Sequence, residues 1–273
     1  MTYCVGILVD AGLVLIADTR TNAGVDNISM YKKLHVLCET PERQIYCASA
    51  GSLSVTQSML SMLEEGLPPE DAGDPSRTVA AQPTMFRVAQ LVGEALHAAR
   101  DTVAAAVAGT NITPSGSLLV GGRIGDDPPC LFQIYVEGNF IECQPDAPFL
   151  QVGERKYGKP ILDRALKWDM SLAHAVKLAL LSFDSTIRSN LSVGRPLDLV
   201  VLTNGQPEPI HRRIEEDDSY FDALSGEWSR LLAEATNELE DPPFMRPGAA
   251  KEVPPEIKPV ADKVSPVPEK VAG

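Results

Sequence analysis

The sequence predicts an α+β protein in which two β-sheets pack face to face and helices cover their outer sides. The first observation is that apolar, β-rich runs come in groups, and pairs of helical patterns separate these groups. The second is that strands and helices do not alternate one by one, as parallel βαβ units would require. The third is composition: 44% hydrophobic and 22% charged residues among 273 allow a sizeable core and exclude global disorder.

The first part of the chain is expected to form strands. The β-rich run Thr2–Val9 and the apolar run Leu13–Asp18 flank a short turn sequence, so together they predict a hairpin. A polar loop is expected over Thr19–Ser29. The later run Gln44–Ala50 predicts another short strand, which a Gly-Ser pair ends.

Helical patterns follow, and a second group of strands comes after them. Ser54–Leu63 and Met85–Ala108 predict two helices, while Gly66–Gln82 is rich in Pro, Asp and Gly and predicts a surface loop. The remaining predicted elements are strands at Ser117–Ile124, Cys130–Val136 and Phe140–Cys143, helices at about Lys159–Lys167 and Leu172–Ile187, a strand at Leu197–Leu202 and an acidic helix at about Asp218–Leu239.

The last stretch, Asp241–Gly273, differs from the rest in composition. It holds 8 of the 22 prolines, with 5 acidic and 5 basic residues. Such a segment cannot bury enough apolar surface to offset its ordering entropy. We therefore expect one domain over residues 1–240 and a disordered tail over 241–273, with an ordered strap lying on the domain as the alternative.

Charge and cysteine content exclude several classes of function. The 24 basic and 37 acidic residues give a net charge of −13, which disfavours binding to nucleic acid or to an anionic membrane. No apolar run approaches the roughly 18 residues of a membrane span, and we expect no secretory signal. The five cysteines are scattered and lack C-x-x-C spacing, which favours reduced thiols in the cytoplasm. Histidine spacing predicts no metal site, and the absence of a P-loop motif predicts no nucleotide cofactor.

The N-terminus offers a nucleophile and a base on one residue. Removal of Met1 would leave Thr2 first in the chain, with both a hydroxyl and a free α-amine. The hydroxyl can then attack while the amine accepts its proton. An α-amine has an ordinary pKa of about 7.7–8.0, so much of it is neutral and basic at cellular pH. Threonine at position two is common, however, so Thr2 alone is a weak signal.

Two charged residues could tune that nucleophile. Asp18 closes the second apolar run, and Lys33 follows the polar loop. A lysine close to the hydroxyl and amine would lower their pKa values, and an aspartate would hold the lysine in place. Taken singly, Asp18 is better explained as a turn cap and Lys33 as a surface lysine.

The joint pattern resembles the proteasome-like N-terminal nucleophile (Ntn) hydrolases, and among them most closely the bacterial Anbu, or ancestral β-subunit, group. Four stretches occur in the order and spacing of a proteasome β-type subunit: Thr2–Ile7, Gly12–Arg20, Lys32–His35 and Ala48–Ser52. The opening Met1–Ile7 and the later Lys156–Leu162 point to Anbu itself. The resemblance covers about residues 2–210.

The resemblance implies a four-layer α-β-β-α sandwich with Thr2 as the nucleophile. It assigns Asp18 and Lys33 as the acid–lysine pair, with Lys32 as the neighbouring alternative. It gives the oxyanion-binding backbone N–H to Gly51. Ser192 falls where the family has a serine near the threonine amine.

This sequence also departs from the family pattern around the amine. Ser189 stands where the family has an aspartate, and Glu154 lies in Val152-Gly153-Glu154-Arg155, where Gly-Ser-Gly is usual. The expected function is a cytoplasmic threonine peptidase that cleaves polypeptides within a homo-oligomer, without cofactor, nucleic acid or membrane; no unfoldase partner is assigned. The alternatives are an Ntn hydrolase of a small amide and an inert structural or binding ring component.

Overall fold

The structure, a computed structural model, describes residues 2–22, 28–69, 71–72 and 74–246. It divides into two compact units, Met1–Trp228 and Ser229–Gly273. The boundary predicted at residue 240 stays a prediction. Within the predicted tail, Pro243–Met245 form a 3-10 turn, and residues 247–273 lie outside the described ranges.

The first unit contains two five-stranded antiparallel sheets. The order in the first sheet is β10-β1-β2-β11-β12, with strands Phe149–Gly153, Tyr3–Val9, Gly12–Asp18, Leu197–Thr203 and Ile210–Ile214. The order in the second sheet is β5-β6-β7-β8-β9, with strands Leu34–Thr40, Arg43–Gly51, Gly116–Ile124, Cys130–Tyr135 and Phe140–Glu142. A separate two-stranded hairpin pairs β3 (Arg20–Asn22) with β4 (Ile28–Met30).

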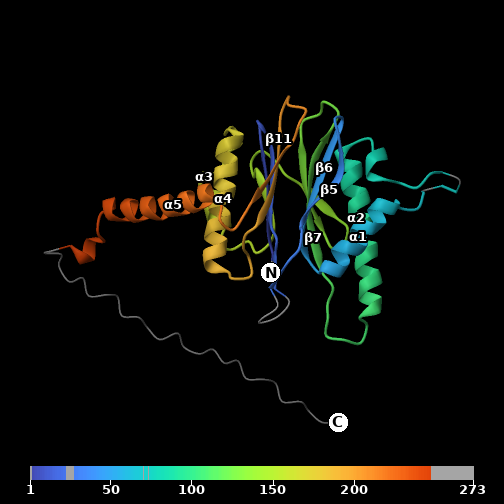
Figure 1. The fold of residues 1–273 in the computed structure, drawn as a ribbon, viewed down its shortest axis with the longest axis horizontal. Helices are drawn as coiled ribbons and strands as arrows, with labels where there is room; N and C mark the ends of the chain where they lie inside the picture. Colours follow the sequence, from blue (N-terminus) through green and yellow to red (C-terminus); the bar gives the residue numbers. More distant parts are fainter. Residues whose placement is uncertain (1, 23–27, 70, 73, 247–273) are drawn as a thin grey trace, which may run out of the picture. The chain divides into compact units, whose positions relative to one another are not determined.

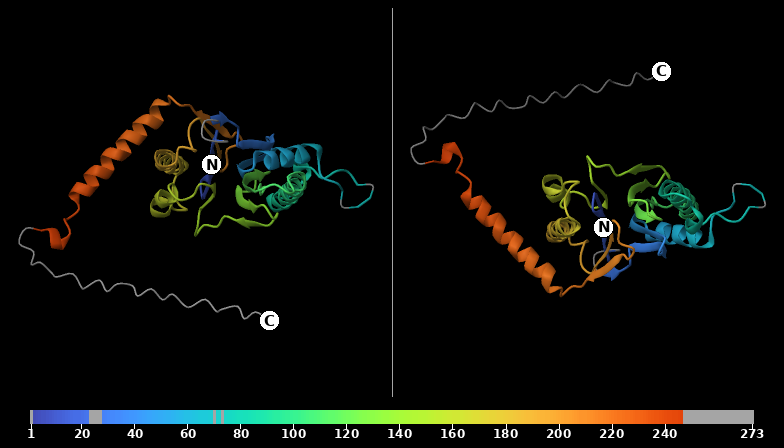
Figure 2. Two further views of the ribbon diagram at one scale, coloured as in Figure 1. Left: turned by 90° about the horizontal axis from the view of Figure 1, so that it is seen from below. Right: turned by 90° about the horizontal axis from the view of Figure 1, so that it is seen from above.

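Helices cover the outer face of each sheet, as Figures 1 and 2 show. α1 (Leu53–Glu65) and α2 (Met85–Ala106) lie on the second sheet, and α3 (Lys159–Ala165) and α4 (Leu172–Ser189) lie on the first. The unit is therefore a four-layer α-β-β-α sandwich, which confirms the predicted fold. A fifth helix, α5, spans Ser219–Glu238. Within the described ranges, no helix is long and apolar enough to cross a membrane.

Three apolar clusters fill the spaces between the layers, and the central one lies between the two sheets. Strand β1 shows why the fold needs this arrangement. Val5 and Ile7 pack toward α4, whereas Cys4 and Leu8 point into the space between the sheets. Because both faces of β1 are buried, its sequence is a continuous apolar run instead of an alternating one.

The predicted hairpin and helices are confirmed, with ends that differ by a few residues. The loop predicted over Thr19–Ser29 is wrong in part, because β3 and β4 pair there. Strands β5, β10 and β12 were not predicted. β12 reads Ile-His-Arg-Arg-Ile, and its first four residues are exposed at the edge of the sheet, so its sequence carries no apolar alternation. A short 3-10 helix, Val79–Ala81, lies in the loop predicted over Gly66–Gln82.

Candidate active site

Thr2 is fixed directly in front of β1 by the neighbouring strand β10. Its carbonyl oxygen accepts a hydrogen bond from the backbone N–H of Glu154 at 2.7 Å. Gly153 has a φ of +83°, and a Cβ there would lie 2.1 Å from the Thr2 oxygen. Only glycine permits this approach. The hydrogen bond and the close contact with Gly153 therefore hold the Thr2 backbone at the end of β1, an interior strand of its sheet.

Asp18 and Lys33 form a buried ion pair beside Thr2. Asp18 ends β2 and is fully buried, and Lys33 directly precedes β5 and is 6% exposed. The Lys33 ammonium donates to Asp18 Oδ1 at 2.7 Å and to the carbonyl oxygen of Arg20 at 2.5 Å. Asp18 Oδ1 also accepts the backbone N–H of Tyr3 at 3.0 Å. The carboxylate thus joins the lysine to the residue that follows Thr2.

The charge of this pair is set by opposing effects. Burial raises the pKa of Asp18, while the Lys33 ammonium and the Tyr3 N–H lower it by stabilising the carboxylate. A buried charge left without its partner would be costly, so each member of the pair keeps the other in place.

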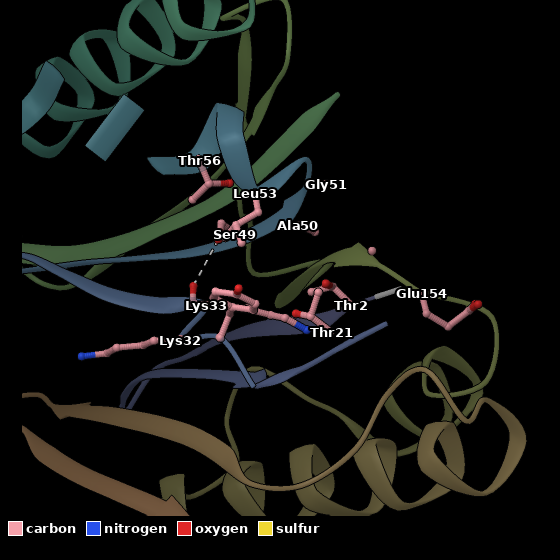
Figure 3. A pocket seen from close by; sticks show the side chains of 12 residues that line it. Thr2, Thr21, Lys32, Lys33, Ser49, Ala50, Gly51, Leu53, Thr56 and Glu154 are labelled. Atoms are coloured by element: carbon pink, nitrogen blue, oxygen red, sulfur yellow. Dashed lines mark hydrogen bonds between the residues drawn. The ribbon is translucent and has the colours of Figure 1, made fainter. Parts of the chain in front are cut away.

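The two neighbouring lysines differ in direction. Figure 3 shows the Lys33 side chain reaching toward Thr2, whereas the Lys32 side chain extends away from it. Lys32 is exposed, and the ion pair with Asp18 is made by Lys33. The geometry therefore favours Lys33 over the alternative that the sequence left open.

Thr2, Lys33 and Gly51 line one cavity of about 360 Å³. Its walls come from the residue before β1, strand β3, the segment before β5, the end of β6, the start of α1 and the end of β10 with the residue after it. The other lining residues are Thr21, Tyr31, Lys32, Ser49, Ala50, Leu53, Thr56, Gly153 and Glu154. Gly51 has a φ of +118°, and a Cβ there would lie 2.6 Å from the Ser115 carbonyl oxygen, so no larger residue fits this backbone.

Comparisons with solved structures give close matches over most of the chain. Anbu from Hyphomicrobium sp. strain MC1 is 46% identical with a TM-score of 0.78, over 88% of this chain and 98% of that one. An Anbu complex from Pseudomonas aeruginosa, described as a helical assembly, is 42% identical with a TM-score of 0.80, over 88% and 98%. The chain belongs to the Anbu family. Anbu from Yersinia bercovieri is 38% identical with a TM-score of 0.76, over 87% and 98%. No protein-family model and no curated protein matches this sequence.

Membership of the Anbu family confirms the resemblance drawn from the N-terminal motifs. This chain covers nearly the whole length of each Anbu structure compared with it. The catalytic roles stay predictions for all five residues: Thr2, Asp18, Lys33, Gly51 and Ser192.

The loop that carries Ser192 contacts Asp18, because the backbone N–H of Gly194 donates to that carboxylate. Ser192 is half-buried in this loop after α4, where its N–H donates to Asn190 Oδ1 at 3.0 Å, and it does not line the cavity. Glu154 does line the cavity, and its Oε2 accepts from Asn190 Nδ2 at 3.1 Å. In this Anbu chain, Glu154 departs from the family's usual sequence, and it connects the cavity to the loop that carries Ser192.

Among the residues that the structure describes, the three buried cysteines are poor nucleophiles, because burial disfavours their thiolates. Cys4 is fully buried and its thiol donates to the Ser49 carbonyl oxygen at 3.5 Å; burial raises its pKa well above the ordinary value. Burial also raises the pKa of Cys47 and of Cys143 to about 12. Across the described part of the chain, no three His, Cys, Asp or Glu side chains gather as a set of metal ligands.

Proposed function

We propose that this Anbu chain is a threonine-type Ntn hydrolase that cleaves peptide bonds. The observation that carries the proposal is the shared position of Thr2, Lys33 and Gly51 on one cavity, with Asp18 holding both the Lys33 ammonium and the N–H of Tyr3. This arrangement supplies a nucleophile, a positive charge near it and a backbone donor facing the same space.

The proposed reaction begins when Met1 is removed, because a peptide nitrogen cannot accept a proton and a free amine can. Thr2 Oγ then attacks the carbonyl carbon, and its proton passes to the α-amine. The backbone N–H of Gly51 donates to the developing oxyanion. The amine delivers the proton to the leaving nitrogen as the C–N bond breaks, and water later hydrolyses the acyl-threonine. No step uses a cofactor.

Lys33 is proposed to favour the deprotonated forms of the hydroxyl and the amine through its positive charge. Ser192 is proposed as a more distant support of the amine, because the loop that carries it contacts Glu154 of the cavity through Asn190. The free cysteines of the described chain suit a reducing compartment, and we propose that the protein acts in the cytoplasm.

Intact-mass measurement after treatment with an epoxyketone or a β-lactone tests this function. We expect a chain that lacks Met1 and carries one adduct, which peptide mapping places on Thr2. A preparation that quantitatively retains Met1, or an adduct on another residue, would contradict the proposal.

We also propose that the chain assembles into a homo-oligomer, since the Pseudomonas aeruginosa relative is described as a helical assembly. Light scattering is expected to give a mass well above twice that of the 29.4 kDa chain at micromolar concentration. A mass near that of one chain would show that the protein is a monomer and would end this part of the proposal.

A further inference from the structure

We infer that a second cavity, adjoining Gly51, is the subsite that binds the leaving-group side of the substrate, and that it selects a carboxylate there. The inference rests on the proposed function. This cavity has a volume of about 340 Å³ and shares Ala50, Gly51 and Gly153 with the cavity around Thr2. A substrate whose reacting carbonyl lies at Gly51 therefore has one space on each side of the bond to be cleaved.

Two buried glutamines line the second cavity, and they differ in their partners. Gln151 is 5% exposed, and its side-chain amide donates to the hydroxyl of Tyr3. Gln133 is 7% exposed, and within the described residues its side-chain amide makes no hydrogen bond. The Gln133 side chain lines this cavity and also the adjoining one, which Asp146 and Asp163 line, so its amide can hydrogen-bond to an occupant of either space.

The charge of the cavity wall favours an anion. Arg155 lines it, while the wall contains no aspartate or glutamate. Arg155 is exposed and forms no ion pair or hydrogen bond with any residue that the structure describes. A guanidinium binds carboxylate oxygens through two parallel N–H donors, which makes a carboxylate the matching ligand. The amide of Gln133 can donate to the same ligand or to a peptide carbonyl beside it.

The position of strand β10 assigns this cavity to the leaving group. Tyr3 of β1 pairs with Gly153 of β10, and the N–H of Glu154 donates to the Thr2 carbonyl oxygen at 2.7 Å. Gly153 lines both cavities, and Arg155, two residues further along, lines the second. The second cavity therefore adjoins the N-terminal end of β1, where the α-amine is located. The amine must return its proton to the leaving nitrogen, so that nitrogen has to lie on the amine's side.

The acyl part of the substrate then occupies the first cavity, which Lys33 and Leu53 line. In the reaction, the bond from Thr2 Oγ to the carbonyl carbon forms and the bond to the leaving nitrogen breaks. The proton of the hydroxyl passes through the amine to that nitrogen. The carboxylate held by Arg155 can belong to an acidic side chain that follows the cleaved bond or to the terminal carboxyl of a short peptide.

Equilibrium binding to the full-length Thr2→Ala chain tests the subsite without any bond cleavage. The probes are fluorescently labelled peptides in two matched pairs. The first pair compares glutamate with glutamine, and both peptides have an amidated C-terminus. The second pair contains glutamine in both peptides and compares a free with an amidated C-terminus. We expect about fivefold tighter binding for at least one carboxylate over its neutral partner, the size expected of an exposed ion pair. The pair that shows the preference identifies the source of the carboxylate.

The same preference should disappear with Arg155→Gln and persist with Lys156→Gln, which removes a neighbouring exposed charge outside the cavity. Gln133→Leu should weaken binding of both members of a pair. Equal binding of charged and neutral peptides, no binding of any probe, or an unchanged preference in Arg155→Gln would each overturn the inference.

A second measurement separates this inference from the proposed function. Thr2 of the unsubstituted chain is acylated by an activated ester, and the acyl-enzyme is allowed to partition between water and added glutamic acid α-amide or glutamine α-amide. We expect about fivefold more transfer to the glutamic acid derivative. If no acyl-enzyme forms, the proposed function fails and the binding result still decides the subsite. If an acyl-enzyme forms and transfers equally to both amines, the subsite inference is wrong.

Discussion

Thr2→Ala is expected to fold and assemble like the unsubstituted chain and to lose reaction with epoxyketones and β-lactones. Alanine keeps the α-amine and the backbone bond from Glu154 N–H to residue 2, so the position of β1 is unchanged. It removes the hydroxyl oxygen, the atom proposed to attack. We expect the second-order rate of adduct formation to fall by roughly 10³-fold or more, measured by intact mass over time.

Thr2→Ser is the matched control for this variant. Serine retains both the hydroxyl and the amine, so a substantial part of the reactivity should remain. A Thr2→Ala chain that reacts as fast as the unsubstituted chain would contradict the threonine mechanism, because another residue would then be the nucleophile.

Lys33→Ala is expected to lower both reactivity at Thr2 and stability. The variant removes the positive charge near the nucleophile, and we expect adduct formation to slow by roughly 10²-fold. It also leaves the Asp18 carboxylate fully buried without its ammonium partner. Breaking a buried pair in this way costs about 3–5 kcal/mol, measurable by denaturant unfolding.

The stability loss in Lys33→Ala should depend on pH. Burial already raises the pKa of Asp18, and without Lys33 only the backbone N–H groups of Tyr3 and Gly194 oppose that rise. A carboxyl whose pKa is higher in the folded chain binds protons on folding, so stability falls as pH rises from its unfolded pKa through its folded one. The deficit relative to the unsubstituted chain should therefore be smaller near pH 4 than near pH 7.

Lys32→Ala is the control, because it removes an exposed charge one residue away. It should leave the free energy of unfolding nearly unchanged and affect reactivity little. Full reactivity in Lys33→Ala together with loss in Lys32→Ala would show that the other lysine tunes the nucleophile.

Much of the fold follows from local sequence. The continuous apolar runs of β1 and β2 predict strands that are buried on both sides, and the apolar periodicity of α2 and α4 predicts helices that cover a sheet. The side chains of Thr84 and Ser171 cap those two helices by accepting a backbone N–H. The strands that were not predicted are short or exposed, and tertiary pairing alone defines them.

The sequence by itself determined the candidate nucleophile, the acid–lysine pair and the family, because these depend on residue type and on order along the chain. It assigned Lys33 and left Lys32 as an alternative, since only the backbone direction before β5 decides which side chain reaches Asp18. The second cavity was also invisible, because Gly51, Gln133 and Arg155 come from different strands and segments. Their proximity arises when β10 pairs with β1, a contact between residues about 150 positions apart that no local pattern encodes.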